Sequence, residues 1–210
     1  MKVLFLGPHT DDVELGAGGT LFKFLENGNE ILWVVFSTAE DALPATLPRD
    51  TLKKEFLRVC NSLGLKERNY KIFNFRVRRL HEHRQEILQK LVEIRDDFSP
   101  DLVIGPSTND YHQDHQVLTN EMIRAYKNSS AIICYELPWN HVRFDSKAFV
   151  KLEARHVEKK FDLLKNYKSQ IMQNKPYLSK EFIFGWARMR GVQVNSEFAE
   201  SFEVIKWILL

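Results

Sequence analysis

Short apolar runs alternate with amphipathic segments along most of the chain. Each apolar run is four to eight residues long and rich in β-branched or aromatic side chains, which is typical of buried strands. Between them, apolar residues recur at helical spacing, as Leu52, Phe56 and Val59 do. The predicted strands cover residues 2–7, 30–37, 70–75, 102–105, 131–135 and 198–208. The predicted helices cover residues 16–27, 49–62, 81–97, 114–127 and 152–168, with 180–190 as a loop or short helix.

This alternation has a direct topological meaning. Strand–helix–strand repeats of roughly 30 residues predict a parallel sheet with right-handed crossovers. Nothing in the sequence marks a domain boundary or an internal repeat, so residues 1–210 are expected to form a single domain. We therefore predict an α/β fold in which the segments that follow the strands open at one edge of the sheet.

Polar residues follow the first predicted strand at once. His9, Asp11 and Asp12 stand between that strand and a Gly-rich helix start at residues 16–20. Ligands of α/β sheets bind outside the carboxyl ends of the strands, where this elbow lies. Taken alone, the elbow also fits a capped helix start, because Asp and Thr are favoured there and carboxylates suit the helix dipole.

A second polar loop follows the fourth predicted strand. It carries His112, Asp114 and His115, and in a parallel sheet it opens at the same edge as the first elbow. A pair of histidines three residues apart is by itself more often a surface feature than a ligand set. Two such clusters at the same sheet edge, however, favour a metal site over two unrelated surface features.

The residue types match a catalytic zinc, which takes three protein ligands and leaves one position for water. His9 and Asp12 supply two ligands, and one histidine of the second loop supplies the third. Zinc lowers the pKa of its water toward about 7, and Asp11 is free to act as general base on that water. The remaining histidine can donate a hydrogen bond or a proton, with Asp114 expected to orient it. A dinucleotide loop is disfavoured, since GxGxxG is not matched and the acidic residues would repel phosphate.

Composition narrows the classes of partner. A net charge of +2 is too small to indicate a nucleic-acid-binding protein. The two cysteines are far apart in sequence and predict buried apolar residues of a reduced, cytoplasmic protein. No apolar run approaches the roughly 20 residues of a membrane span, and the N-terminal run is too short for a signal peptide. The apolar C-terminal segment, residues 204–210, predicts a final strand or a segment docked on a partner subunit, which leaves open a monomer or a homo-oligomer.

With these residues assembled, the chain resembles the LmbE-like (PIG-L-like) family of zinc-dependent N-deacetylases. The first family motif, HxDDxExG, matches residues 9–16, and the second, HPDH, matches residues 112–115. Supporting motifs match Lys160 with residues 167–170, residues 199–202 and, in part, residues 49–51. The resemblance spans nearly the whole chain and implies a Rossmann-like three-layer sandwich with a mostly parallel central sheet.

The resemblance also implies roles for individual residues. His9, Asp12 and His115 resemble the zinc ligands, and Asp11 resembles the general base. His112 resembles the acidic or electrophilic histidine, with Asp114 as its partner. The residues expected to contact substrate are Arg49, Tyr111 and Arg78.

Three departures from the family pattern matter. Thr10 and Gln113 replace prolines, and Asp50 replaces a glycine. Where many relatives have an aspartate after the third strand, this chain has Val77-Arg78-Arg79. This basic connector favours an anionic substrate such as a sugar phosphate or nucleotide sugar.

The expected function is the hydrolytic removal of an acetyl group from an N-acetylated amino sugar, its glycoside or its nucleotide-linked form. The expected cofactor is Zn²⁺, although the same ligand set suits Fe²⁺. Two alternatives stay open: a non-catalytic sugar-binding or nucleotide-sugar-binding module on the same fold, and a metal-dependent hydrolase of another bond.

Overall fold

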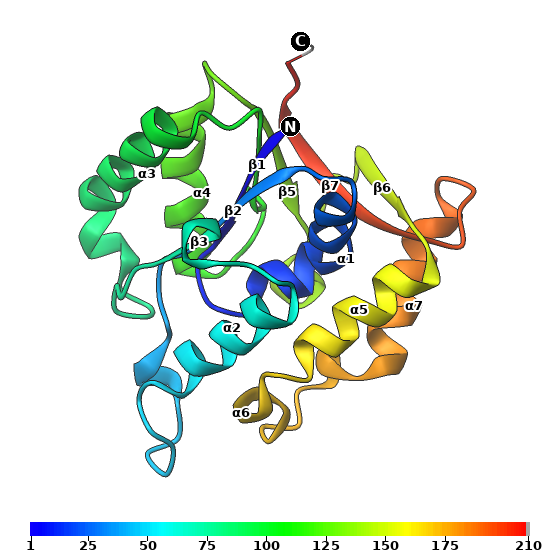
Figure 1. Ribbon diagram of the computed structural model, residues 1–210, viewed down its shortest axis with the longest axis horizontal. Coiled ribbons are helices and arrows are strands. Elements are labelled where there is room, and N and C mark those ends of the chain that lie inside the picture. Colours follow the sequence, from blue (N-terminus) through cyan, green and yellow to red (C-terminus); the bar gives the residue numbers. More distant parts are fainter. Residues whose placement is uncertain (209–210) are drawn as a thin grey trace.

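A computed structural model describes residues 1–208, in which helices alternate with strands along most of the chain (Figure 1). The strands are β1 (Lys2–Gly7), β2 (Glu30–Val35), β3 (Tyr70–Ile72), β4 (Leu102–Pro106), β5 (Ala131–Tyr135), β6 (Ala148–Leu152) and β7 (Phe198–Lys206). The helices are α1 (Asp12–Glu26), α2 (Thr51–Ser62), α3 (Arg84–Phe98), α4 (Gln113–Tyr126), α5 (Ala154–Leu164), α6 (Lys168–Ile171) and α7 (Lys180–Val192).

The strands form one sheet in the order β3-β2-β1-β4-β5-β7-β6. The first five strands pair in parallel, and β7 pairs antiparallel with both β5 and β6. The prediction of an α/β, Rossmann-like fold with a mostly parallel central sheet is therefore confirmed.

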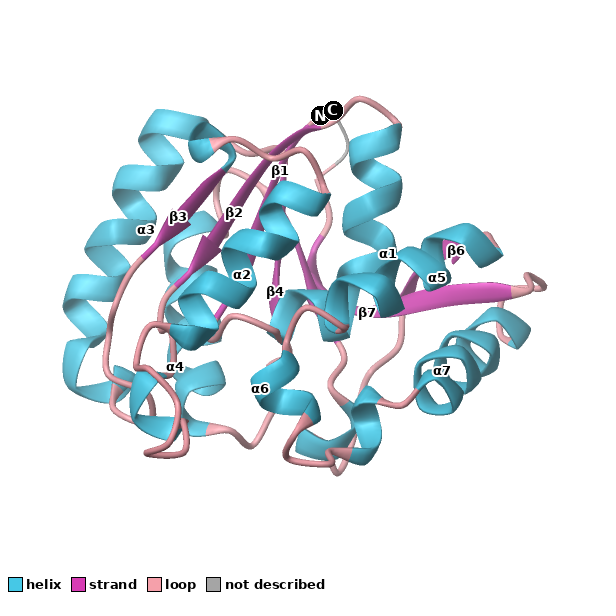
Figure 2. Cartoon of the chain, turned by 60° about the horizontal axis from the view of Figure 1, so that its bottom comes forward, coloured by secondary structure: helices cyan, strands magenta, loops and turns pink. Residues whose placement is uncertain are grey.

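Helices cover both faces of the sheet (Figure 2). Alternate side chains of β1 pack against the helices of opposite faces. Val3 and Phe5 belong to one apolar cluster, together with residues of α1, α2, α5 and α7. Leu4 and Leu6 belong to the other, together with residues of α3 and α4. Successive side chains of a strand point to opposite faces, so a continuous apolar run serves two cores at once.

The strand order reverses next to β1, which pairs with β2 on one side and β4 on the other. At such a switch point, the segments that leave the two central strands diverge to opposite faces and leave a crevice between them. The elbow after β1 and the loop after β4 meet there, as the sequence predicts.

Helix α1 begins at Asp12 and not at residue 16, so the prediction of its start was wrong. The Gly-rich segment lies inside the helix, which kinks at Ala17 (φ −144°). The glycines allow close packing: a Cβ at Gly16 would lie 2.4 Å from the ring of Tyr135, and one at Gly19 would lie 2.5 Å from Leu152.

Several further elements differ from their predicted extents. Residues 180–190, predicted as a loop or short helix, belong to the 13-residue helix α7, and β6 was not predicted. The final strand ends at Lys206, and residues 209 and 210 of the predicted C-terminal segment lie outside the described residues. Both cysteines are buried and free, as predicted. None of the described helices combines the length and apolar character needed to cross a membrane.

Candidate metal centre

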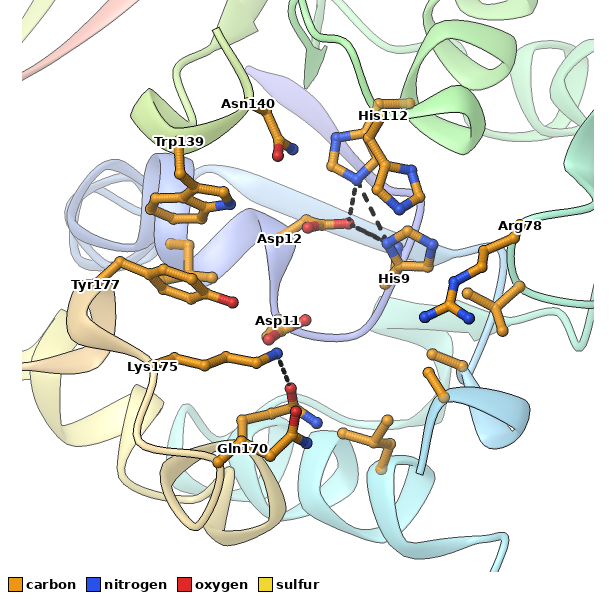
Figure 3. Close-up of a pocket in the computed structure, with 17 residues that line it drawn as sticks. His9, Asp11, Asp12, Arg78, His112, Trp139, Asn140, Gln170, Lys175 and Tyr177 are labelled. Atoms are coloured by element: carbon orange, nitrogen blue, oxygen red, sulfur yellow. Dashed lines mark hydrogen bonds and ion pairs between the residues drawn. The ribbon is translucent and has the colours of Figure 1, made fainter. Parts of the chain in front are cut away.

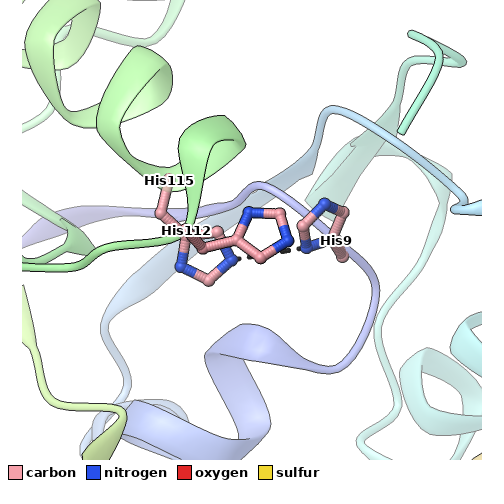
Figure 4. A group of neighbouring side chains, drawn as sticks. All are labelled: His9, His112 and His115. Carbon is pink, nitrogen blue, oxygen red and sulfur yellow. Dashed lines mark hydrogen bonds between the residues drawn. The ribbon is translucent and has the colours of Figure 1, made fainter. Parts of the chain in front are cut away.

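Three histidines from the two polar segments meet at the switch point. His9 comes from the elbow after β1, His112 precedes α4, and His115 lies in the first turn of α4. One ring nitrogen of each lies within 4.8 Å of the others (Figure 4). His9 and His115 are almost fully buried, whereas His112 is half-buried.

A tighter group of ligand atoms includes the carboxylate of Asp12 (Figure 3). Oδ2 of Asp12 lies 3.1 Å from Nδ1 of His9 and 3.3 Å from Nε2 of His115, and those two nitrogens are 3.4 Å apart. Ligand atoms at about 2.0–2.1 Å from a tetrahedral zinc are themselves roughly 3.3 Å apart. The three donors therefore fit one divalent ion, and two imidazoles with one carboxylate are a usual donor set for zinc.

Each of the two buried imidazoles forms a hydrogen bond to a carboxylate through the ring nitrogen that faces away from the ligand group. Nε2 of His9 donates to Asp114 over 3.0 Å, and Nδ1 of His115 donates to Asp110 over 2.7 Å. Such partners fix the tautomer and orientation of a ligating imidazole and raise its basicity. The inward-facing nitrogens are thereby left free to bind an ion.

The expected pairing of Asp114 with His112 was wrong, because the Asp114 carboxylate contacts His9 instead. The physical reason is the basic connector. The backbone N–H of Arg78 donates to Asp114 over 2.6 Å and that of Leu80 over 3.2 Å, which holds the carboxylate on the His9 side. Asp110 was missed by the sequence analysis, although an acidic residue five positions before His115 was a visible signal.

The charges around this group favour a cation between the donors. Burial lowers the pKa of His9, but Asp12 and Asp114 outweigh it and raise the pKa to about 9. Burial likewise opposes protonation of His115, yet Asp12 and Asp110 raise its pKa to about 10. The same attraction from His115 and His9 holds the pKa of Asp12 well below its usual range, against the effect of burial. In the absence of a metal, protons on these imidazoles carry the positive charge that the carboxylates attract.

His112 differs from the other two histidines. Burial and repulsion by His115 and His9 lower its pKa to about 4, so its ring is neutral at pH 7. Its Nδ1 accepts the backbone N–H of Asp114 over 3.2 Å, which assigns the proton of the neutral ring to Nε2. His112 is therefore a neutral hydrogen-bond donor at the wall of the cavity.

Asp11 occupies the N-cap position of α1, but its side chain makes no capping hydrogen bond. The alternative of a capped helix start is therefore met in position only, because Asp11 does not cap the helix with its side chain. Its carboxylate lines the cavity beside Asp12. Burial and repulsion by Asp12 raise the pKa of Asp11, against the attraction of Lys175 and His9. Asp11 is a free carboxylate with raised basicity next to the ligand group.

The cavity in front of these residues has a volume of about 310 Å³. Six lining residues come from far along the chain, namely Trp139, Asn140, Gln170, Gln173, Lys175 and Tyr177. Of these, Trp139, Lys175 and Tyr177 lie across the cavity from Arg78 (Figure 3). None of these six was predicted as a site residue. Gln170 had a visible signal in the Tyr167–Gln170 motif, and it accepts a hydrogen bond from Lys175.

The three expected substrate contacts have different outcomes. Arg78 lines the cavity, whereas Arg49 and Tyr111 do not. The side chain of Arg49 is 81% exposed and lies 3.9 Å from Asp41, and Tyr111 is 68% exposed. Arg49 thus faces solvent, and this structure does not show its expected contact beside the candidate ligands.

The chain matches a known protein family and is similar to known proteins. Residues 4–126 match the family described as PIG-L: GlcNAc-PI de-N-acetylase. The chain is 26% identical over 172 residues to the uncharacterized deacetylase YaiS of Escherichia coli K12, covering 80% of this chain and 90% of that protein.

Two solved structures share the fold. One is an N,N'-diacetylchitobiose deacetylase from Pyrococcus horikoshii, with a TM-score of 0.79, 21% identity, and coverage of 97% of this chain and 83% of that chain. The other is GalB, the 4-carboxy-2-hydroxymuconate hydratase of Pseudomonas putida KT2440, with a TM-score of 0.78, 18% identity, and coverage of 100% and 98%. The fold alone therefore does not decide the reaction. The family match, however, spans more than half of the residues, and on this ground the chain belongs to the PIG-L family of de-N-acetylases.

Proposed function

We propose that the protein is a metal-dependent hydrolase that removes the acetyl group from an N-acetylated amino sugar, its glycoside or its nucleotide-linked form. The reaction adds water across the amide C–N bond: the carbonyl carbon gains the oxygen and leaves as acetate, and the nitrogen leaves as a free amine. The observation that carries this proposal is the free carboxylate of Asp11 beside three donor atoms 3.1–3.4 Å apart.

The proposed ligands are His9, Asp12 and His115, and the proposed ion is Zn²⁺. When bound, such an ion supplies a Lewis acid that activates water and polarises the amide carbonyl. The carboxylates of Asp114 and Asp110 keep the two imidazoles aimed at the ion from behind. His112 stays outside the proposed ligand set because Asp12 lies closer to the other two donors, with its Oδ2 at 3.1 Å from His9 and 3.3 Å from His115, whereas the three-histidine group spans up to 4.8 Å.

Asp11 is the proposed general base. It takes a proton from the attacking water, and its raised pKa makes it a stronger base than an exposed aspartate. His112 is the proposed oxyanion donor, because its Nε2–H can donate to the oxygen that becomes negative as water adds to the carbonyl. Preorganised donors of this kind contribute about 10²–10³-fold in kcat. The proton held by Asp11 then passes to the leaving amine.

The alternatives make different use of the same cavity. A sugar-binding module needs no basic carboxylate beside the ligand atoms, and the Asp11 side chain does not cap the helix that follows it. A hydratase like GalB would add water to a carbon–carbon double bond and release no acetate. Acetate release therefore separates the proposed function from both.

The test is a panel of free, glycosidic and nucleotide-linked N-acetyl amino sugars, incubated with the zinc-loaded protein and scored for acetate and free amine in equal amounts. Asp11→Asn is the matched control, because it preserves size while removing the base. We expect this variant to bind zinc normally and to lose about 10²–10⁴-fold in turnover. Absence of acetate from every compound would reject the proposed function, and near-normal turnover by Asp11→Asn would reject the role of Asp11.

A further inference from the structure

Two cationic side chains line the cavity without a carboxylate partner. Among residues 1–208, neither Arg78 nor Lys175 has an acidic oxygen within ion-pair distance. Both point toward the space around Asp11 and His9 in Figure 3, from opposite sides of the cavity. A cation that lines a cavity without an ion pair is free to bind an anion that enters it.

The two neighbouring arginines differ from Arg78, because both form ion pairs. Arg76 forms an ion pair with Asp41 at 2.7 Å, and Arg79 forms one with Glu82 at 2.6 Å. These two arginines are thus neutralised on the surface of the same connector. Arg78 alone of the three lines the cavity and keeps its guanidinium unpaired.

The backbone of Arg78 is also strained. Its φ of 66° lies in the left-handed region, which costs a residue with a Cβ about 1–2 kcal/mol relative to its ordinary conformations. Its N–H is the one that holds Asp114 behind His9. A glycine would satisfy both requirements more easily, so the presence of a long cationic side chain at this position points to a task for the guanidinium.

Lys175 lies deeper on the opposite wall and is half-buried. Gln170 accepts a hydrogen bond from its ammonium, and the ammonium lies 5.7 Å from the ring centre of Tyr177. Tyr177 in turn stacks on Trp139, with ring centres 3.9 Å apart and planes at 13°. These contacts therefore hold the ammonium next to Asp11 (Figure 3).

With a divalent ion bound, the net charge of the cavity wall would favour the binding of an anion. Apart from the histidines, the charged side chains that line it are Asp11, Asp12, Arg78 and Lys175, which balance. A divalent ion would leave the wall with an excess of two positive charges. Asp110 and Asp114 offset that excess only from behind the imidazoles, where they are fully buried. A neutral sugar leaves the two cations on the cavity side uncompensated.

We propose that the cavity selects an N-acetyl amino sugar that carries an anionic oxygen group, a phosphate or a carboxylate, close to the acetamido carbon, and that Lys175 and Arg78 bind this group. This inference rests on the proposed function, which puts the acetamido group next to Asp11. On a 2-acetamido sugar, the substituents nearest that group are those on C1 and C3. The two sources of the anion are therefore a C1 phosphate and an acidic ether on O3.

The experiment compares three substrates of the zinc-loaded protein: N-acetylglucosamine 1-phosphate, N-acetylmuramic acid and the neutral methyl N-acetylglucosaminide. We expect at least one anionic substrate to have a kcat/KM about tenfold above that of the neutral one, which is the gain expected from one charge-assisted contact. Lys175→Gln and Arg78→Gln should each lose about that factor on the preferred anionic substrate, mainly through KM, and less than about threefold on the methyl glycoside. Arg76→Gln is the matched control from the same connector and should change neither.

Each other outcome has a definite meaning. Equal losses on charged and neutral substrates, or a wild-type preference for the methyl glycoside, would overturn the inference while leaving deacetylation intact. If no compound releases acetate, the proposed function fails, and calorimetric binding then decides the inference separately. Tighter binding of an anionic sugar than of the methyl glycoside, weakened by Lys175→Gln and Arg78→Gln but not by Arg76→Gln, would support it. Anion binding that is unchanged in both variants would overturn it, because the anion would then contact only the metal.

Discussion

Asp11 and Asp12 are adjacent in sequence but lie in opposite electrostatic environments. His115 and His9 hold the pKa of Asp12 well below its usual range, although burial opposes this. Burial and the charge of Asp12 raise the pKa of Asp11. Two neighbouring groups whose pKa values are pushed apart are typical of an acid–base site. A single peptide bond thus separates a ligand candidate that favours its ionised form from a carboxylate able to exchange protons.

The ligand set leads to the first prediction at this scale. Asp12 and His112 compete for the third position beside His9 and His115, and the shorter distances favour Asp12. Asp12→Ala should weaken zinc binding at least about 100-fold, since a ligand matters more than its outer partners, whose loss costs about 10–100-fold. His112→Ala should change zinc affinity by less than about tenfold while it lowers turnover. Elemental analysis and competition with a chelator measure both effects, and the reverse ranking would assign His112 as the ligand.

The sequence could predict which residues meet at this site but not all of their contacts. One rule, that the ends of neighbouring parallel strands share an edge, brought His9 and Asp12 together with the two histidines of the second loop. The choice of His115 as the ligand came from the family resemblance. The partners of the imidazoles depend on the path of the backbone. Asp110 and Asp114 are equivalent acidic residues in the loop sequence, and only the N–H groups of Arg78 and Leu80 decide which side Asp114 faces.

At the scale of elements, helix α1 depends on a side chain from the far end of the chain. The kink at Ala17 frees the N–H groups of Gly19 and Thr20, and the carboxylate of Glu200 on β7 accepts both, over 3.1 and 2.7 Å. Lys160 on α5 pairs with the same carboxylate at 2.7 Å, and both side chains are almost fully buried. The supporting sequence motifs around Lys160 and Glu200 thus have a structural role, which is to hold the helix that begins at Asp12.

This buried pair leads to the second prediction. Lys160→Met should destabilise the protein by about 3–5 kcal/mol, because it leaves the Glu200 carboxylate buried without its counter-charge. The double variant Lys160→Met/Glu200→Gln should recover part of that loss, since it removes the buried charge, and the single amide oxygen still accepts one of the two N–H groups, which donate to different carboxylate oxygens in the wild type. Urea unfolding of the single and double variants measures the difference. If the double variant were less stable than Lys160→Met, the carboxylate would be stabilising even without the lysine.

The parts of the structure that the sequence did not predict lie in segments without a regular hydrophobic pattern. Strands β1, β2 and β4 are continuous apolar runs, and their buried patterns identify them. The wall that carries Trp139, Lys175 and Tyr177 comes from short turns between elements, where no periodicity exists to detect. Strand β6 is only half-buried along most of its length, and its pairing with β7 depends on a tertiary contact.

At the scale of the whole molecule, the candidate metal centre joins segments about 100 residues apart. His9 and Asp12 belong to the elbow after β1, and His115 belongs to α4 on the opposite face of the sheet. The carboxylate of Asp114 also links residues 76–80 to this centre, because it accepts hydrogen bonds from the backbone N–H groups of Arg78 and Leu80. An ion at this point binds the folded chain and not the unfolded one, so it must stabilise the fold as a whole.

The last prediction follows from this linkage and from the raised pKa values. Zinc at 100 times its dissociation constant should add about 2.7 kcal/mol to the free energy of unfolding and raise Tm accordingly. At a fixed zinc concentration, the gain should grow as the pH rises from 6 to 8, because the dissociation constant falls. In the metal-free fold, His9 and His115 have pKa values raised to about 9 and 10, so both are protonated in this window, and zinc must displace their protons to bind. Each displaced proton makes binding stronger by about 1.4 kcal/mol per pH unit. Calorimetry in buffers of different ionisation enthalpy should count close to two protons released per zinc at pH 7, and scanning calorimetry should show the rising Tm gain. His115→Ala should abolish most of the gain, and a gain that did not depend on pH would mean that the ion binds elsewhere.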